Sequence, residues 1–274
     1  MDIHRATAPD HSSLDQLGHR LVLVAKRRPT TSEAISRHQA TERDRRLMAM
    51  GVRHGRLVAS QAWRWEWPTS ATPAAARNRL SELVTAGYFE HRSRFPGEGV
   101  YVPTAKAARL VRELTGGLSE PKVPDKHECR WLSQLPHDLT IPEAERWLCS
   151  RAPEGSRFLT VRELFRERAL TRPPAQRRGG AGMGYRPDGV LALPPGERIA
   201  VEVELHAKAE RLAEPGGKLA DYAAAHARGE YAEVLWLVPA RGVAGPLTRA
   251  IERTGCGHFM AVEVPPEAVL RYAA

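Results

Sequence analysis

Hydrophobic residues in the first half of the chain recur at the spacing of an amphipathic helix. Ala76, Leu80 and Leu83 lie three or four residues apart and form one apolar stripe. Pro73 precedes the stripe and suits the first turn of a helix, whereas Gly87 follows where a helix end is expected. The pattern therefore predicts a helix between these two residues.

Two shorter helices are expected before this one, over residues 42–50 and 58–63, and a hairpin is expected after it. Runs with aromatic and β-branched residues flank a Pro-Gly-Glu-Gly turn at 96–99. A further helix at 105–114 closes the segment. Three helices followed by a hairpin is the order of a winged helix-turn-helix, which we predict for residues 41–116.

After residue 127, short apolar runs of strand length alternate with helical segments. Strands that alternate with helices are typical of an α/β domain with parallel pairing. We predict such a domain, with a mixed sheet, for residues 127–274. Its expected helices are 142–150, 207–228 and 245–254, and its expected strands include 158–164, 233–238 and 259–264.

The remaining segments differ in composition. Residues 1–40 are polar and basic, and we interpret them as a partly ordered arm, whereas the Gly- and Pro-rich residues 117–126 are typical of a linker. No apolar run approaches the roughly 18 residues that span a bilayer, and the first residues have no secretory pattern. The three cysteines form neither a metal motif nor a disulfide framework. These features predict a cytoplasmic protein without a membrane partner.

The net charge of +9 is unevenly distributed. Residues 1–124 carry 20 Lys and Arg against 12 Asp and Glu, whereas residues 125–274 carry 21 against 20. A basic N-terminal half favours a polyanionic partner, and double-stranded DNA fits a winged helix. The alternative is a basic surface that serves only solubility, on a winged helix used for protein contacts.

The predicted DNA contacts lie on three elements of this domain. The N-terminal residues of the second helix of a helix-turn-helix face the bases, where Arg can read guanine and Asn can read adenine. Basic residues at a wing tip suit phosphates or the minor groove. The candidate DNA-binding residues are Arg77, Asn78 and Arg79 on the helix, Arg92 and Arg94 on the wing, and Lys106 beyond it.

An acidic cluster is predicted in the second half of the chain. Asp188 lies on one expected strand, and Glu202 and Glu204 lie on the next. Residues two apart on a strand point to the same face, and a hairpin partner brings Asp188 beside them. Three acids so placed repel one another unless a divalent cation or protons neutralise them. The alternative is a solvated sheet face.

The stretches PDGV (187–190), IAVEVE (199–204) and GGKLADY (216–222) resemble the replication-relaxation family of plasmid and integrative-element proteins. The resemblance covers roughly residues 41–265. It implies an N-terminal winged helix joined to a restriction-endonuclease-like, PD-(D/E)xK domain. It also implies a role at replication or transfer origins of mobile DNA, with replication or transfer proteins as partners.

The resemblance also assigns roles to individual residues. Asp188 corresponds to the first metal-binding acid and Glu202 to the second, with Mg²⁺ or Mn²⁺ as the cofactor. The position two residues further, usually lysine in this nuclease class, is Glu204, which would be a base or a further ligand. The missing positive charge would come from Lys208 or Lys218, and an outer carboxylate from Glu143 or Glu145.

Three functions remain open at this point. The first is a DNA-binding protein that carries a nuclease-like domain and acts in the replication, maintenance or transfer of a mobile element. The second is an active metal-dependent endonuclease or nickase with Asp188, Glu202, Glu204 and Lys218 as catalytic residues. The third is a transcription or copy-number regulator without catalysis, in which the acids are solvated or paired.

Overall fold

The computed structural model describes residues 40–69, 72–94, 97–115, 129–164, 187–206, 209–240 and 242–272. The chain divides into two compact units, residues 1–129 (unit 1) and residues 130–274 (unit 2). The predicted arm and linker lie outside the described residues, apart from the last residue of the arm. In the described part of the chain, no helix is long and apolar enough to cross a membrane.

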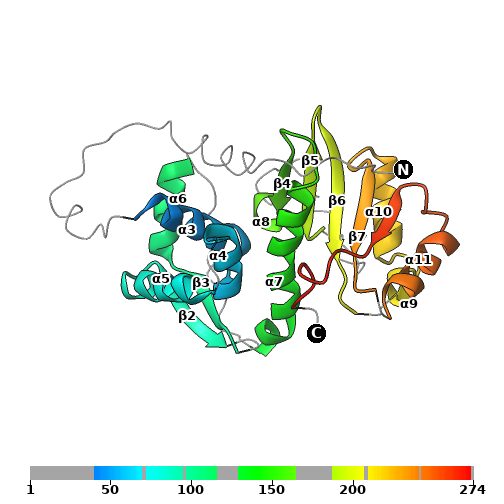
Figure 1. Ribbon diagram of the computed structural model, residues 1–274. Coiled ribbons are helices and arrows are strands. Elements are labelled where there is room, and N and C mark those ends of the chain that lie inside the picture. The colour runs from blue at the N-terminus through cyan, green and yellow to red at the C-terminus, as the bar shows by residue number, and fades with distance from the viewer. Residues whose placement is uncertain are drawn as a thin grey trace. The chain divides into compact units, whose positions relative to one another are not determined.

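Unit 1 has the predicted order of three helices, a hairpin and a further helix (Figure 1). The first helix begins with a capping box, in which Thr41 and Asp44 each accept from the backbone N–H of the other. It ends at Gly55, which adopts the left-handed conformation with φ 85°. The helices are α3 (Glu42–His54), α4 (Ala59–Glu66), α5 (Ala74–Thr85) and α6 (Ala105–Thr115).

The strands of unit 1 form a three-stranded antiparallel sheet in the order β1-β3-β2. The hairpin is the predicted one, whereas the third strand was not expected, because it is only two residues long. One core joins the sheet to the helices. It includes Leu47, Leu80 and Leu83, all fully buried. The strands are β1 (Leu57–Val58), β2 (Phe89–Arg94) and β3 (Gly99–Pro103).

Unit 2 is built on a five-stranded mixed sheet in the order β4-β5-β6-β7-β8. The first three strands are antiparallel neighbours, whereas β6, β7 and β8 pair in parallel. This confirms the predicted α/β class with a mixed sheet. The strands are β4 (Arg157–Thr160), β5 (Gly189–Leu193), β6 (Glu197–Val203), β7 (Glu233–Leu237) and β8 (Met260–Glu263).

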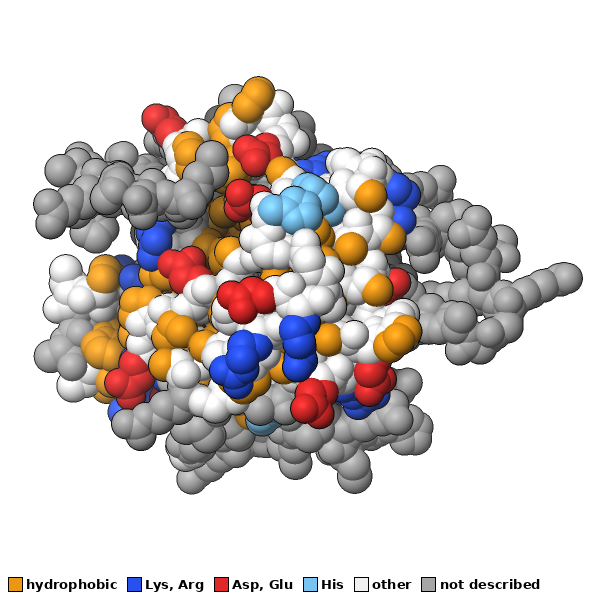
Figure 2. All heavy atoms as spheres, turned by 90° about the vertical axis from the view of Figure 1, so that its right-hand side faces the viewer, with side chains coloured by type: hydrophobic (Ala, Val, Ile, Leu, Met, Phe, Trp, Pro, Cys, Tyr) orange, Lys and Arg blue, Asp and Glu red, His pale blue; other side chains and the backbone are white. Residues whose placement is uncertain are grey.

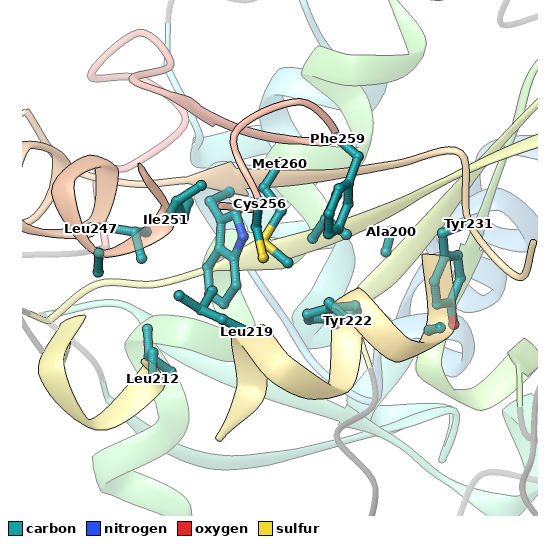
Figure 3. Close-up of a cluster of buried hydrophobic side chains, with 14 of the residues drawn as sticks. Ala200, Leu212, Leu219, Tyr222, Tyr231, Leu247, Ile251, Cys256, Phe259 and Met260 are labelled. Atoms are coloured by element: carbon teal, nitrogen blue, oxygen red, sulfur yellow. The ribbon is translucent and has the colours of Figure 1, made fainter. Parts of the chain in front are cut away.

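Helices cover both faces of this sheet (Figure 1). Alternate residues of β6 point to opposite faces, so Val201 packs with Ala144 and Leu148 of α7, whereas Ala200 packs with Tyr222 of α10. The cluster on the α10 face contains the buried Trp236 and residues of α10, α11 and the start of β8. Figure 3 shows Tyr222, Leu247 and Met260 from this cluster. The helices are α7 (Cys129–Cys149), α8 (Val161–Leu164), α9 (Ala209–Leu212), α10 (Lys218–Ala227) and α11 (Ala244–Arg253).

Two helices of unit 2 differ from the sequence-based prediction. The first, α7, starts well before Pro142 and contains both Pro136 and Pro142. The Thr140 hydroxyl donates to the Pro136 carbonyl inside the helix, at 2.8 Å. The helix expected over 207–228 is instead two helices, because Gly216 has φ +73° and a Cβ at Gly217 would lie 2.7 Å from the Leu212 carbonyl oxygen.

Candidate acidic site and nucleic-acid interface

Asp188 and Glu202 lie near each other at one end of the antiparallel pair β5–β6. Asp188 was predicted on the first strand, but it immediately precedes β5, whose first residue Gly189 is the register partner of Val201. Glu202 follows Val201 on β6, and the two carboxyl groups interact electrostatically. The structure therefore brings together the two acids that the sequence predicted to be neighbours.

Glu202 lies on the face of β6 that α10 covers, and its exposed fraction is 1%. The Lys218 ammonium group donates to Oε2, and the Tyr222 hydroxyl donates to Oε1. Lys218 and Tyr222 are four residues apart on α10 and so share one helix face. Tyr222 itself packs edge-on against Trp236, with ring centroids 6.1 Å apart (Figure 3). One helix face thus holds both oxygens of this carboxyl group.

Burial has the largest effect on the pKa values of Glu202 and Lys218. Removal from water raises the pKa of Glu202 to about 8, although Lys218 and Tyr222 both favour the charged form. The negative charge of Asp188 raises this pKa further. Burial also disfavours the charge on Lys218, but the carboxylates of Glu202 and Asp188 outweigh it and raise the pKa of the ammonium group. Lys218 therefore stays positively charged, whereas the neighbouring Glu202 is a weaker acid than an ordinary glutamate.

Asp188 is held from the opposite side of the sheet. Its Oδ2 accepts from the Val203 backbone N–H at 2.9 Å, and the His137 Nε2 of α7 lies 3.0 Å away. Burial opposes ionisation of Asp188, but the hydrogen bond and positive charge of His137 prevail and lower its pKa. Burial likewise opposes the His137 charge, but hydrogen bonds to Asp138 and Asp188 raise the His137 pKa to about 10. Asp188 is thus the ionised acid of the pair.

The other predicted members of this site lie differently. Glu204 is one residue beyond β6, and its Oε1 accepts from the His206 backbone N–H at 3.1 Å. Its carboxylate contributes to the raised pKa of Lys218, so it lies near the cluster. Glu143 is buried on α7 and Glu145 is partly buried there. Lys208 falls outside the described residues.

Asp188 and Glu202 provide as many carboxylate ligands as usually bind a hard divalent cation. Mg²⁺ is usually bound by one or two carboxylates together with waters and substrate phosphates. Within the described ranges, no three His, Cys, Asp or Glu side chains are grouped to hold a metal ion. Asp188 is 18% exposed at its side chain and Glu202 is 1% exposed. A cation would therefore approach from the Asp188 side.

The outward face of α5 is the main candidate nucleic-acid surface of unit 1. Arg77 and Asn78 are both exposed, one helical turn after the start of the helix. Ser81 lies one turn further on the same exposed face, whereas Ala76 and Leu80 are fully buried. Arg77 and Asn78 therefore lie off the apolar stripe of α5.

Arg79 points elsewhere. Its Nε and Nη2 donate to the two carboxylate oxygens of Asp44 on α3, with the Nε contact at 2.6 Å, and its Nη1 donates to Glu82. Asp44 is fully buried, and the Arg79 side chain is 22% exposed. Arg79 therefore joins α5 to α3, an arrangement that leaves its guanidinium group engaged within unit 1.

The remaining basic candidates are on and beside the hairpin. The Arg92 guanidinium lies 2.5 Å from a Glu90 oxygen on the same strand. Arg94 ends β2, but its side chain lies outside the described residues. Lys106 donates to the Ala86 carbonyl at 2.7 Å, just after the end of α5, and its ammonium lies 4.3 Å from the centre of the Tyr88 ring. A cation there suits the negative end of α5.

Sequence reasoning did not assign His137 to the acidic site, and it found Tyr222 only as part of a resembling stretch. His137 is 51 residues from Asp188 and lies on a helix whose first half was not predicted. Tyr222 carried a detectable signal, because it lies four residues after Lys218 on one helix. Comparison of the chain with protein-family models, curated proteins and solved structures finds no match. The candidate functions therefore rest on the geometry of the two units.

Proposed function

We propose that the protein binds duplex DNA through unit 1 and carries a nuclease-like domain in unit 2. In this proposal residues 41–116 are a winged helix-turn-helix, with α5 as the recognition helix and the β2–β3 hairpin as the wing. The observation that carries it is the exposed face of α5. Arg77 and Asn78 stand there beside the small side chains Ala74 and Ala75, so a helix face that reads bases is free of bulky apolar groups.

The distribution of charge supports the same proposal. The N-terminal half of the sequence carries nearly all of the net positive charge, as a surface that contacts phosphates requires. Figure 2 shows a face of unit 2 on which acidic and basic side chains are interspersed. Within unit 1 we assign direct DNA contact to Arg77 and Asn78. Arg79 and Lys106 hold α5 in place instead, because their donors bond to Asp44 and Ala86.

Binding of the full chain to duplex DNA tests this assignment. We expect the double change Arg77→Ala and Asn78→Ala to lower affinity roughly tenfold or more, because each side chain contributes to base or phosphate contacts. The matched control is Arg253→Ala, which removes one exposed positive charge from the end of α11. Fluorescence anisotropy at several salt concentrations measures both affinity and its salt dependence. Equal affinity and equal salt dependence in all three proteins would refute the recognition-helix assignment.

A second candidate function is metal-dependent cleavage of DNA by unit 2. The observation that favours it is the proximity of Asp188 and Glu202, with Lys218 bonded to Glu202 from the first turn of α10. Apart from the four-residue helices α8 and α9, the chain order is α7, β4, β5, β6, α10, β7, which is compatible with the restriction-endonuclease-like domain that the resemblance implies. In this proposal Lys218 takes the role of the lysine that is missing at position 204.

The chemistry of this candidate follows from the residues present. Asp188 and Glu202 would hold Mg²⁺ or Mn²⁺, which when bound supplies an activated water and offsets charge on a phosphate. The Lys218 ammonium would face the negative charge that builds up on the scissile phosphate. Each Glu202 oxygen already accepts one hydrogen bond, so a cation would bind through the remaining lone pair of one of them.

Incubation of supercoiled plasmid with the full chain and Mg²⁺ or Mn²⁺ tests cleavage. We expect nicking to be lost in Asp188→Ala and in Lys218→Ala, and to remain in the control Glu252→Ala, which removes an exposed acid of α11. Nicking that persists in Asp188→Ala would refute the site assignment. DNA binding without nicking by the unchanged chain would leave the DNA-binding proposal standing and remove this second candidate.

A further inference from the structure

His137 lies on α7, which covers one face of the sheet. Its side chain contacts Asp188, which belongs to the acidic site. Its Nε2 lies 3.0 Å from Asp188 Oδ2, and its Nδ1 lies 3.5 Å from Asp138 Oδ1. The Asp188 oxygen that contacts His137 also accepts from the Val203 backbone N–H. Both hydrogen bonds thus end on Oδ2. Among the residues that the structure describes, Asp188 Oδ1 has no hydrogen-bond partner.

Such an arrangement fixes a carboxylate in one orientation. A carboxylate held by a single bond rotates about its last torsion, whereas two donors on one oxygen define both its position and the direction of the other oxygen. In protein metal sites the ligating carboxylates are themselves hydrogen-bonded by outer partners, and loss of such a partner typically weakens metal binding 10- to 100-fold. Asp188 has this kind of support, and Asp138 in turn contacts the second nitrogen of His137.

We propose that His137 is a positioning residue, which holds Asp188 Oδ2 so that Oδ1 is presented to a divalent cation. This inference rests on the second candidate function, in which Asp188 and Glu202 form a cation site. His137 is a third element of that site, contributed by α7, whereas Glu202 and Lys218 come from β6 and α10. His137 does not touch the cation itself in this proposal.

The test is titration of the full chain with Mn²⁺, followed by electron paramagnetic resonance of the free ion. We compare the unchanged chain with Asp188→Ala, His137→Ala, His137→Gln and the control His258→Gln, which alters an exposed histidine of the same unit. Glutamine keeps a side-chain N–H donor but cannot be charged. We expect no binding by Asp188→Ala, affinity roughly 10- to 100-fold weaker for His137→Ala, and recovery of most of that loss in His137→Gln.

The outcomes separate this inference from the proposed site. If Asp188→Ala abolishes binding while His137→Ala binds as the unchanged chain does, the positioning role is refuted and the cation site stands. If His137→Gln binds as weakly as His137→Ala, the hydrogen bond is not what supports Asp188, and the inference fails. If the unchanged chain binds no Mn²⁺, or Asp188→Ala binds it equally well, the cation site and the inference both fall. Thermal melting of each variant identifies any loss that comes from unfolding.

Discussion

Each unit contains a buried carboxyl group paired with a basic side chain, and the pKa values of the two carboxyl groups are shifted in opposite directions. Asp44 in unit 1 is 0% exposed and Glu202 in unit 2 is 1% exposed. Burial raises the pKa of both. For Asp44, hydrogen bonds from Arg79 and Thr41 overcome that effect and lower the pKa, whereas Glu202 has a pKa raised to about 8. Two carboxyl groups that are both closed to solvent therefore differ in their ionisation.

The number of donors and the neighbouring charges contribute to the difference. Asp44 accepts from two nitrogens of Arg79 and from both the backbone N–H and the hydroxyl of Thr41. Among the described residues, Glu202 accepts from Lys218 and Tyr222, and it faces the charge of Asp188. A carboxylate that accepts several hydrogen bonds links parts of the structure. One that accepts few hydrogen bonds and lies beside a like charge is typical of functional sites. Five predictions test this contrast, from the largest expected effect to the smallest.

The largest effect is expected from breaking the pair of Asp44 and Arg79. Asp44→Asn should lower the free energy of unfolding of unit 1 by roughly 3 kcal/mol, because it leaves the Arg79 charge partly buried without its partner. Urea unfolding gives the size of the loss, and hydrogen exchange of the α3 and α5 amides assigns it to unit 1. Glu42→Gln, which changes an exposed acid in the first turn of α3, is the control. Equal stability of the two variants would contradict the structural role of Asp44.

The second prediction concerns pH. Glu202 has a pKa near 8 in the fold against a usual value of 4.5, so its protonated form stabilises the fold below about pH 4.5. That contribution is lost as the pH rises from about 4.5 towards 8, by up to about 1.4 kcal/mol per pH unit. Glu202→Gln should flatten this decline, as measured by urea unfolding at a series of pH values. An unchanged slope would show that Glu202 ionises normally.

Asp44 should behave in the opposite way on the acid side. Its pKa lies below the usual value of 3.8, so its contribution is complete above that value and is lost as the pH falls further. Asp44→Asn should therefore remove part of the acid-induced unfolding of unit 1, while Glu202→Gln leaves it unchanged. The two variants serve as controls for each other in one pH series.

A smaller effect is expected from Tyr222→Phe. The change removes the hydroxyl that donates to Glu202 Oε1 while leaving the ring in its apolar cluster. We expect a loss of about 1–2 kcal/mol in the free energy of unfolding, because a buried carboxyl oxygen loses its partner. The pKa of Glu202 should rise further, and the pH series described above would measure it. A stability equal to that of the unchanged chain would mean that the bond to Tyr222 contributes little.

The smallest effect is expected at the surface just after the end of the same helix. Arg228 lies 2.5 Å from Glu230, but the two side chains are 43% and 33% exposed. Arg228→Ala should change the free energy of unfolding by no more than about 0.5 kcal/mol, because exposed ion pairs are weak and are screened by salt. A loss as large as that of Asp44→Asn would mean that exposure does not control the strength of these pairs.

Much of the fold could be predicted from the sequence, because local patterns determine it. The apolar spacing of Ala76, Leu80 and Leu83 located α5, and the strand expected to carry Glu202 and Glu204 corresponds to β6, which ends one residue before Glu204. The two-residue strand β1 carried no detectable pattern. The break before Lys218 was missed, although Pro215 and two glycines indicate it, because the apolar pattern continues on both sides.

Less of the candidate site was predictable. The proximity of Asp188 and Glu202 was predictable because both lie near the strands of one hairpin, which is a local structure. The contact of His137 with Asp188 joins elements 51 residues apart, and no spacing rule connects them. Arg79 lies near the border of the apolar stripe, so its choice between solvent and Asp44 depends on where α3 packs. Long-range packing thus decides the roles that local patterns leave open.

The spacing of Lys218 and Tyr222 along α10 has a consequence for how the sequence can change. Lys218 is the first residue of α10, and Tyr222 follows one turn later. Each residue of a helix is rotated by about 100° from the one before it. Inserting or deleting one residue between the two would therefore rotate one of the side chains away from Glu202. The turn between α9 and α10 lies outside this spacing. We expect natural variants to preserve the number of residues between Lys218 and Tyr222 more strictly than the length of that turn.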